Sequence, residues 1–305
     1  MIEDPLSLWN AGQAKERILR FILGTTLEGS ESYVEPVDRI AVFDNDGTLW
    51  AEQPYYTQLQ FAIDRMRDLA SQHPEWQDDP ALKAALDEDV EAMAAQGMAG
   101  IAKIVAVSHT GITTEELAVI VRKWIASARH PHFDRPYTDL IYQPQLQLMD
   151  FLRSQGYRTY IVSGGGVEFL RAWAQDVYGI PPEQVVGTSV MTSYELRDGR
   201  GVLLQLPEID LVDDGPGKPV GINKYIGRRP IIAVGNSDGD LEMLQYTTTG
   251  DRPGLGVYIH HDDAKREFAY DRGAHIGGLD EGLREAAQRD WVVVSMRDDW
   301  SEIFV

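Results

Sequence analysis

Short apolar runs alternate with longer amphipathic segments over much of the chain. We expect a buried strand in each of the runs 39–43, 157–162, 231–234 and 291–294. Helical spacing is found at 11–24 and 144–155. Residues 185–206 predict a strand and a hairpin, with Asp198–Gly199 as the turn. Alternation of this kind is typical of a parallel sheet with helices on both faces, so the pattern predicts an α/β fold.

Residues 55–130 have a different character, because helix-forming residues dominate them. Four helical segments are expected, at about 55–72, 80–96, 98–108 and 114–129. Asp79–Pro80 has the features of a helix start for the second segment. Thr113 with Glu116 three residues later forms a capping box for the last segment. We therefore interpret this block as a helical insertion.

Composition excludes several classes of function. The chain has 305 residues and a formal charge of −20, so we expect neither nucleic acid nor an anionic membrane as a partner. There is no cysteine, which excludes disulfides and thiolate chemistry. We find no membrane-spanning run and no signal-peptide pattern, so a cytoplasmic protein is expected as the sequence stands. A periplasmic or secreted protein stays open if a signal peptide has been removed, and the sequence indicates no oligomeric state.

Three of the expected strands end in polar loops that contain glycine, at 44–48, 163–166 and 235–240. In a parallel sheet these loops lie at the carboxyl ends of the strands, where ligands bind. In the first loop, the Asp44 side chain and the Asp46 backbone carbonyl can share a cation, and such oxygen ligands suit Mg²⁺. Asp44 could attack phosphorus, Asp46 could act as acid and base, and the Thr48 hydroxyl could donate to a phosphate oxygen. The ordinary alternative is a polar turn with capping aspartates.

The other two loops and one lysine could complete a phosphate site. Ser163 and Gly164 offer a hydroxyl and a backbone N–H near a helix start. Lys218, or Lys224 as the competing candidate, could neutralise the charge of Asp44 and a phosphate. The third loop offers oxygen ligands for a metal, from Asn236, Asp238 and Asp240. The run from His260 to Asp263 is interpreted as a polar strand exit and not as a metal site.

These motifs resemble those of haloacid-dehalogenase-superfamily hydrolases, on the phosphoserine-phosphatase-like side. The first motif, Asp-x-Asp-Gly-Thr after an apolar strand, is matched in full by 44–48, and Ile161–Gly165 is similar to the second. Lys218 matches the third motif, and residues 235–240 match the fourth. The spacing between Lys218 and the fourth motif is suitable for the family. The resemblance implies a Rossmann-like, doubly wound core formed by 1–53 and 140–305, with a helical cap inserted at 54–139. It also implies Asp44 as the nucleophile, Asp46 as the acid/base and Mg²⁺ as the cofactor.

The chain departs from the family pattern at two places. The fourth motif usually opens with Gly-Asp, whereas this chain has Gly235–Asn236. We expect Asn236 and Asp240 to hold the metal, with Asp238 in reserve. Phosphoserine phosphatases also carry a glutamate after the first motif that binds the substrate ammonium, and Glu52 lies one residue short of that position, where Gln53 stands. The candidate substrate-binding residues are Glu52, Gln53, Tyr55 and Tyr56.

The expected function is Mg²⁺-dependent hydrolysis of a small phosphomonoester through an aspartyl-phosphate on Asp44. The expected partner is therefore a small phosphorylated metabolite. Two alternatives remain open. A phosphotransferase would use the same residues with an acceptor other than water, and a catalytically silent protein would bind a phosphoester without turnover.

Overall fold

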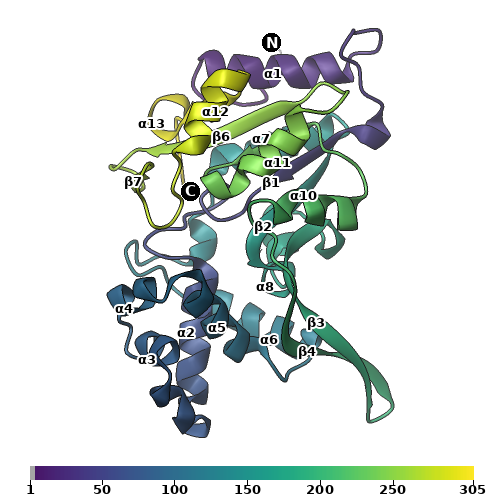
Figure 1. The fold of residues 1–305 in the computed structure, drawn as a ribbon. Coiled ribbons are helices and arrows are strands. Elements are labelled where there is room, and N and C mark those ends of the chain that lie inside the picture. Colours follow the sequence, from purple (N-terminus) through teal and green to yellow (C-terminus); the bar gives the residue numbers. More distant parts are fainter. Residues whose placement is uncertain (1–3) are drawn as a thin grey trace.

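The computed structural model describes residues 4–305 and has two parts, an α/β part and a largely helical part (Figure 1). The α/β part is built on an eight-stranded sheet in the order β4-β3-β2-β1-β5-β6-β7, with β8 pairing with β6. The strands are β1 Ile40–Phe43, β2 Arg158–Gly166, β3 Val185–Arg197, β4 Arg200–Leu211, β5 Ile232–Gly235, β6 Leu255–Asp262, β7 Ala269–Tyr270 and β8 Val292–Ser295. The five pairings among β3, β2, β1, β5, β6 and β8 are parallel, and only the hairpin β3–β4 and the short β7 are antiparallel among the described strands.

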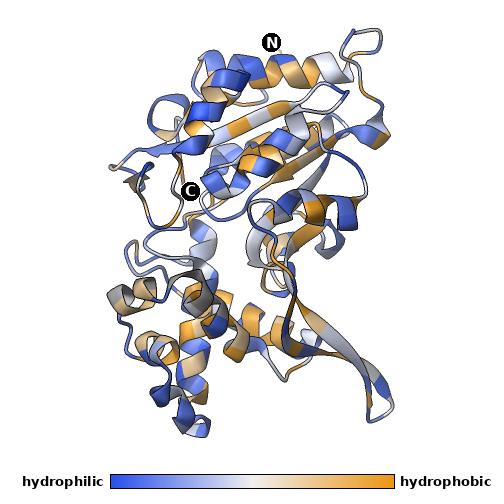
Figure 2. Ribbon diagram, in the orientation of Figure 1, coloured by the Kyte–Doolittle hydropathy of each residue, from blue (hydrophilic) through white to orange (hydrophobic). Residues whose placement is uncertain are grey.

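Helices cover both faces of this sheet, as the strand β1 shows residue by residue. Ala41 and Phe43 pack into one hydrophobic cluster, whereas Ile40 and Val42 pack into another on the opposite face. In Figure 2 orange gathers on the strands at the centre of the sheet, whereas the hairpin β3–β4 mixes orange with blue and white. The helices of this part are α1 Gln13–Thr26, α7 Gln143–Ser154, α8 Val167–Arg171, α9 Ala174–Tyr178, α10 Gly217–Gly221, α11 Leu241–Thr248, α12 Glu281–Arg289 and α13 Met296–Asp299. The predicted doubly wound α/β core is therefore confirmed.

The helical part lies below the carboxyl edge of the sheet in Figure 1. Its helices are α2 Thr57–Leu69, α3 Pro80–Leu86, α4 Val90–Ala95, α5 Gly97–His109 and α6 Thr114–Ile125. Helices α2 to α5 share a hydrophobic cluster of their own, but α6 packs its Leu117, Val121 and Ile125 into the cluster of the α/β part. The capping box of Thr113 and Glu116 is present at the start of α6.

The second helix expected in this block, 80–96, is in fact two helices. The chain turns between α3 and α4, where Glu88 has a φ of 55°. The side chain of Asp89 then accepts the N–H of Ala92 at 2.9 Å and starts α4. The sequence pattern predicted a single helix because the helical spacing of apolar residues continues through this turn. It did not indicate that Asp89 acts as a cap and starts a new helix.

The hairpin β3–β4 is longer than the pattern predicted. It extends from the sheet beside α5 and α6, with its turn at Asp198–Gly199 as expected, and it ends at Leu211 (Figure 1). Leu204 pairs with Thr113 at the start of α6, so the hairpin and the helical part are joined. None of the described helices is both long and apolar enough to cross a membrane.

Candidate active site

The polar loops of three neighbouring strands meet at one edge of the sheet. Strand β1 lies between β2 and β5 in parallel register, with Phe43 opposite both Ile161 and Val234. Asp44 follows Phe43 directly, so it comes to lie beside the loops that follow β2 and β5. The chain thereby brings together residues that are far apart in sequence.

Lys218, from α10, is the buried cation of this edge. Its Nζ donates to Asp44 Oδ1 at 2.7 Å, to Asp240 Oδ1 at 2.6 Å and to the carbonyl oxygen of Val162 at 2.9 Å. Burial alone would lower the pKa of Lys218, but the two carboxylates outweigh it and raise the pKa, so the ammonium stays charged. Lys224 is instead exposed and pairs with Asp210. Of the two candidate lysines, the structure therefore places only Lys218 beside Asp44.

Asp44 and Asp46 both line a cavity next to this cation. Burial, together with the nearby charge of Asp240, raises the pKa of Asp44 although Lys218 opposes this. Among the described residues, no hydrogen-bond donor reaches Asp44 Oδ2. Asp46 is also raised in pKa by burial, and its Oδ1 accepts the indole N–H of Trp50 at 2.8 Å. The two carboxylates thus face the cavity with different partners, Lys218 for one and Trp50 for the other.

The second loop forms another wall of the cavity. Ser163 is buried, and its Oγ accepts the N–H of Gly165 at 3.0 Å. That bond leaves the Ser163 hydroxyl proton available to an acceptor in the cavity. Gly164 lines the cavity too, and its carbonyl accepts the Thr188 hydroxyl of β3 at 2.7 Å. Both residues therefore line the same cavity as Asp44 and Asp46.

The expectation for Thr48 has to be corrected. Its side chain is fully buried, lies outside the cavity lining and donates to Asn236 Oδ1 at 3.0 Å. Asn236 in turn donates from Nδ2 to Glu52 Oε1 at 2.8 Å. Thr48 thus orients Asn236 from behind, and we withdraw it as a direct phosphate contact.

Asp238 also needs correction, because its carboxylate is directed at a helix start. It accepts the backbone N–H groups of Asp280, Glu281 and Gly282 at 2.7 to 3.2 Å, which caps α12. Asp240 remains at the site, where Oδ1 binds Lys218 and Oδ2 accepts the N–H of Asn236 at 2.9 Å. Asp240 therefore serves to hold Lys218 and the third loop, so we withdraw the expectation that it holds the metal. Asp238 is withdrawn as a reserve metal ligand.

The four candidate substrate-binding residues separate into two pairs. Glu52 and Tyr56 line the cavity. Gln53 does not, since its amide donates to the carbonyl of Ile276 at 3.0 Å. Tyr55 is turned toward α2, where its hydroxyl donates to Gln60. Gln53 and Tyr55 are therefore withdrawn.

A buried network behind the first loop was missed from the sequence. His261 donates from Nε2 to the carbonyl of Gly47 at 2.7 Å and from Nδ1 to Glu267 Oε2 at 3.1 Å. Burial opposes protonation of His261, but the hydrogen bond and charge of Glu267 prevail and raise its pKa. Tyr270 stacks on this imidazole and donates to Glu52 Oε1 at 2.8 Å, and burial raises the pKa of Glu52 to about 8.

This network could have been suspected from the alternation along β6. Val257 and Ile259 pack on one face of the sheet, and His261 continues that series with period two. The run from His260 to Asp263 does end β6, as the expected polar strand exit would, but its residue His261 is buried and takes part in the network described above.

The cavity has a volume of about 270 Å³ and lies between the strand edge and the helical part. Sequence patterns did not indicate most of its remaining walls, which come from α5, α8 and the hairpin β3–β4. Gln58 of α2 closes one side, where its Oε1 accepts the N–H of Gly166 at 2.6 Å. Asp214, in the loop before α10, lines the cavity as well, and burial raises its pKa.

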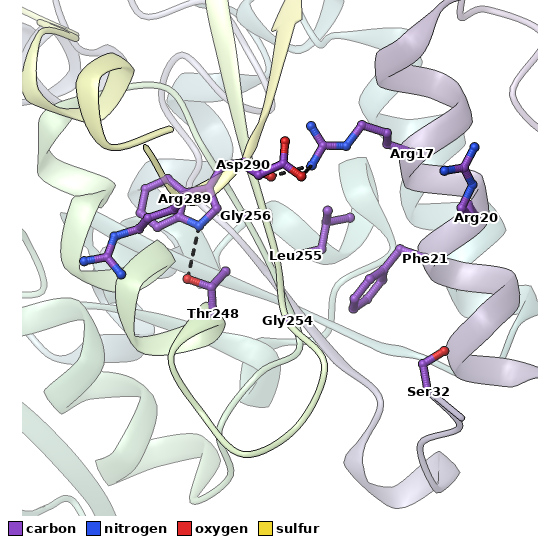
Figure 3. Close-up of a pocket in the computed structure, with 11 residues that line it drawn as sticks. Arg17, Arg20, Phe21, Ser32, Thr248, Gly254, Leu255, Gly256, Arg289 and Asp290 are labelled. Carbon is purple, nitrogen blue, oxygen red and sulfur yellow. Dashed lines mark hydrogen bonds and ion pairs between the residues drawn. The ribbon is translucent and has the colours of Figure 1, made fainter. Parts of the chain in front are cut away.

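A second hollow, of about 620 Å³, lies at the amino end of the sheet (Figure 3). It is bordered by the start of β6 at Leu255, by α1 and by the end of α12. Figure 3 shows Arg17 pointing to Asp290, with which it forms an ion pair of 2.9 Å. Since catalytic groups of parallel sheets lie at the carboxyl edge, we assign no catalytic role to this hollow.

Comparisons with known proteins agree with this architecture. The family model for haloacid dehalogenase-like hydrolases matches residues 41–245, which is more than half of the chain. A search of curated proteins finds no match.

Solved structures share the fold at low sequence identity. A conserved protein of unknown function from Anaerococcus prevotii has a TM-score of 0.60 and 17% identity, over 96% of this chain and 94% of that one. A protein of unknown function from Bordetella pertussis has a TM-score of 0.53 and 19% identity, over 84% and 97%. A phosphoserine phosphohydrolase-like protein from Francisella tularensis is less similar, with a TM-score of 0.40 and 16% identity, over 73% of this chain and 88% of that one. On the match of the family model, the chain belongs to the haloacid dehalogenase-like hydrolases.

Proposed function

We propose that this hydrolase is a Mg²⁺-dependent phosphatase that cleaves a small phosphomonoester through an aspartyl-phosphate on Asp44. The observation that carries the proposal is the ammonium of Lys218. It is buried between Asp44 and Asp240, and Lys218 lines the cavity. A buried ammonium at this place compensates negative charge, and phosphoryl transfer depends mainly on such compensation and on positioning.

The first step is attack by Asp44 on phosphorus. Lys218 holds Oδ1 of Asp44 at 2.7 Å, which leaves Oδ2 for the bond to phosphorus. As that bond forms, the bond from phosphorus to the ester oxygen breaks, and protonated Asp46 gives its proton to the leaving oxygen. The raised pKa of Asp46 is consistent with an acid at this position.

The second step is hydrolysis of the acyl phosphate. Asp46, now ionised, takes a proton from a water molecule that attacks phosphorus. The bond between phosphorus and Asp44 breaks, which frees inorganic phosphate and regenerates the Asp44 carboxylate. The Ser163 hydroxyl and the Gly164 N–H are suited to hold the phosphoryl oxygens in both steps.

The residues at this edge offer oxygen atoms of the kind that Mg²⁺ prefers as ligands. The carboxylates of Asp44 and Asp46 line the cavity, and the ammonium of Lys218 is already shared between Asp44 and Asp240, so there is room for a further positive charge. The described residues contain no cluster of three or more His, Asp or Glu side chains placed to hold an ion. We therefore propose the Asp44 carboxylate and the Asp46 backbone carbonyl as ligands. The amide oxygen of Asn236 already accepts the Thr48 hydroxyl and lies outside the cavity lining, so as a third ligand it would use its second lone pair. When bound, the ion would offset the repulsion between Asp44 and the phosphate.

We also propose that residues 54–139 act as the cap over a core formed by 1–53 and 140–305. The support is that the cavity is closed by residues of both parts, with Asp44 and Ser163 on one side and Ile101 and Val105 on the other.

The proposal is tested by phosphate release from p-nitrophenyl phosphate with Mg²⁺. We expect Asp44→Asn, and chelation by EDTA, to lower kcat by at least about 1,000-fold. Lys218→Met should lower it similarly, whereas the matched exposed variant Lys224→Met should leave it unchanged. Release that persists in Asp44→Asn would refute the mechanism.

Product analysis separates the alternatives. Transfer of the phosphoryl group to an added alcohol in preference to water would identify a phosphotransferase. Binding of the ester, measured by calorimetry, without release of phosphate would identify a catalytically silent binding protein.

A further inference from the structure

Gln58, the second residue of α2, joins the helical part to the second loop of the site. Its Oε1 accepts the backbone N–H of Gly166 at 2.6 Å. A backbone N–H can only donate, so this contact fixes which end of the amide is oxygen. Gln58 also lines the cavity together with Asp44 and Asp46. A carbonyl oxygen from the helical part is thus held beside the residues to which the proposed function assigns the chemistry.

The close approach of this amide depends on Gly166. A β-carbon at position 166 would lie 2.5 Å from Nε2 of Gln58, which is too close for two atoms that are not bonded. The backbone of Gly166 has a φ of −67° and a ψ of 126°, a conformation that any residue adopts. The contact therefore requires the absence of a side chain at this position and not an unusual backbone.

A small space beside Gly165 is bordered by three oxygen atoms. A β-carbon on this glycine would lie 3.3 Å from Oγ of Ser163, 3.5 Å from Oε1 of Gln58 and 3.7 Å from Oδ2 of Asp46. The indole N–H of Trp50 donates to Oδ1 of Asp46, and no hydrogen bond among the described residues occupies Oδ2. The free oxygen of Asp46 and the fixed oxygen of Gln58 therefore border the same space, next to a hydroxyl suited to hold a phosphoryl oxygen.

Two acceptors around one space suit a water molecule that has to attack phosphorus. A water that donates one hydrogen to Asp46 and the other to Gln58 keeps a lone pair free for the attack. In-line attack also requires the water on the side of phosphorus away from Asp44. Asp44 stands on the strand edge, whereas α2 belongs to the helical part on the other side of the cavity (Figure 1). Gln58 thus comes from the side that in-line attack requires.

The carbonyl of Gln58 distinguishes water from the other oxygens that react here. The ester oxygen of the substrate carries no hydrogen, so in the first step it can accept the proton of Asp46 but cannot donate to Gln58. An alcohol that competes with water has one hydroxyl hydrogen, which Asp46 takes. Only water has a second hydrogen for Gln58, so this residue should act on hydrolysis of the acyl phosphate and not on its formation.

We propose that Gln58 is a positioning residue for the second step, in which its Oε1 and Oδ2 of Asp46 together orient the water that hydrolyses the aspartyl-phosphate. This inference rests on the proposed function and adds a residue of the helical part to it. As the water oxygen bonds to phosphorus, one of its protons passes to Asp46 and the bond from phosphorus to Asp44 breaks. The other hydrogen stays on that oxygen, still bound to Gln58, and leaves with the inorganic phosphate.

The first test follows the phosphoryl group on Asp44 through a single turnover. Wild type and Gln58→Met are mixed with p-nitrophenyl phosphate that carries a radioactive phosphoryl group, and are quenched in acid at successive times. We expect decay of the label on Asp44 to slow about 10- to 100-fold more than its formation in Gln58→Met, the effect of one hydrogen bond lost to a reacting group. Gln77→Met, at an exposed glutamine of the helical part, should match wild type in both rates. Equal slowing of both steps, or of neither, would overturn the inference.

A second variant displaces the amide of Gln58 without changing it. Gly166→Ala places a methyl group against Nε2 of Gln58, and the backbone at this position admits alanine. Decay of the label should again slow at least about 10-fold more than its formation. Formation of the label also reports that a variant is folded, so the two substitutions provide independent trials. Decay that keeps pace with wild type in Gly166→Ala would contradict the role of this contact.

Partition of the acyl phosphate between water and methanol provides a readout that a purely structural role would not move, because both acceptors react with one intermediate. In Gln58→Met the ratio of methyl phosphate to inorganic phosphate should rise about 10-fold, since only the reaction with water loses a hydrogen bond. A ratio equal to that of wild type would refute the positioning of water by Gln58.

The same experiments separate this inference from the proposed function. Phosphate release by wild type without any label on Asp44 would refute the proposed function, whatever Gln58 does. Label on Asp44 that decays equally fast in wild type and Gln58→Met would leave the phosphatase standing and refute only the role of Gln58.

Discussion

At the scale of single residues, the pair Asn236 and Glu52 accounts for the departure from the family motif. The Asn236 amide donates to Glu52 Oε1 at 2.8 Å, and burial raises the pKa of Glu52 to about 8, so above that pH the pair holds one carboxylate and one neutral group. A second carboxylate at position 236 would face Glu52 at hydrogen-bond distance and repel it. The neutral amide at this position is thus matched to the glutamate beside it.

A double-mutant cycle tests this match. Asn236→Asp should destabilise the metal-free protein by about 1–3 kcal/mol, the range of coupling between residues in contact. Glu52→Gln combined with Asn236→Asp restores one carboxylate and one amide, and should regain at least half of that loss. Urea unfolding in EDTA at pH 9, where Glu52 is ionised, measures all four proteins. An equal loss in the single variant Asn236→Asp and the double variant would show that the two residues are not matched.

Part of this site could be predicted from single residues and part could not. The number of residues between the lysine and Asn236 was sufficient to prefer Lys218 over Lys224. In the structure Lys218 indeed pairs with Asp44, whereas Lys224 pairs with Asp210. Thr48 and Tyr55 were assigned to the wrong neighbours, since the direction of a loop side chain depends on partners elsewhere in the chain. For Thr48 that partner, Asn236, is 188 residues away.

At the scale of elements, Asp238 joins the third loop to α12. Its carboxylate accepts three backbone N–H groups at the start of this helix, more than forty residues later in the chain. No local pattern predicts such a cap, because the sequence just before Glu281 gives no sign that a distant aspartate replaces the usual N-cap side chain.

Substitution of Asp238 distinguishes a cap from a metal ligand. Asp238→Ala should lower the free energy of unfolding by about 1–2 kcal/mol, whereas Asp238→Asn, which can still accept these bonds, should lose less. Neither should change the Mg²⁺ concentration that gives half-maximal phosphatase activity. A severalfold rise of that concentration in Asp238→Asn would return the residue to the metal site.

At the scale of the whole molecule, the buried pair of His261 and Glu267 connects the first loop to the carboxyl-terminal part of the sheet. Both side chains are almost fully buried, so removal of one leaves the other as an unpaired polar group or charge. His261→Gln should therefore cost about 3–5 kcal/mol at pH 6.

The pH dependence of stability provides a second measurement of this pair. Because the pKa of His261 is raised in the folded state, its contribution is full below its unfolded pKa of about 6.5 and is lost as the pH rises through the folded value. The difference in unfolding free energy between wild type and His261→Gln should thus shrink above pH 6.5. The control is His275→Gln at an exposed histidine, which should follow the wild type at every pH. A difference that stays constant from pH 6 to 9 would contradict a charged His261.

The overall architecture was predictable because strand alternation and the strand-tip motifs are local signals. The cavity was not, because its apolar walls come from α5 and from a hairpin that the pattern placed only in part. Gln205, for example, belongs to a hairpin whose sequence pattern suggests an exposed element. In the structure it is only 2% exposed, because the hairpin packs beside α5 and α6. The lining of the cavity therefore emerges only from tertiary packing.

The most direct test of the account is chemical trapping of the acyl phosphate on Asp44. Protein mixed with a phosphomonoester and Mg²⁺ is quenched in acid within milliseconds and reduced with borohydride, which converts an aspartyl-phosphate to homoserine. Peptide mass spectrometry should then find homoserine at position 44 in wild type and aspartate there when substrate is omitted. Phosphate release with no modification at Asp44, or with modification at another residue, would contradict the account.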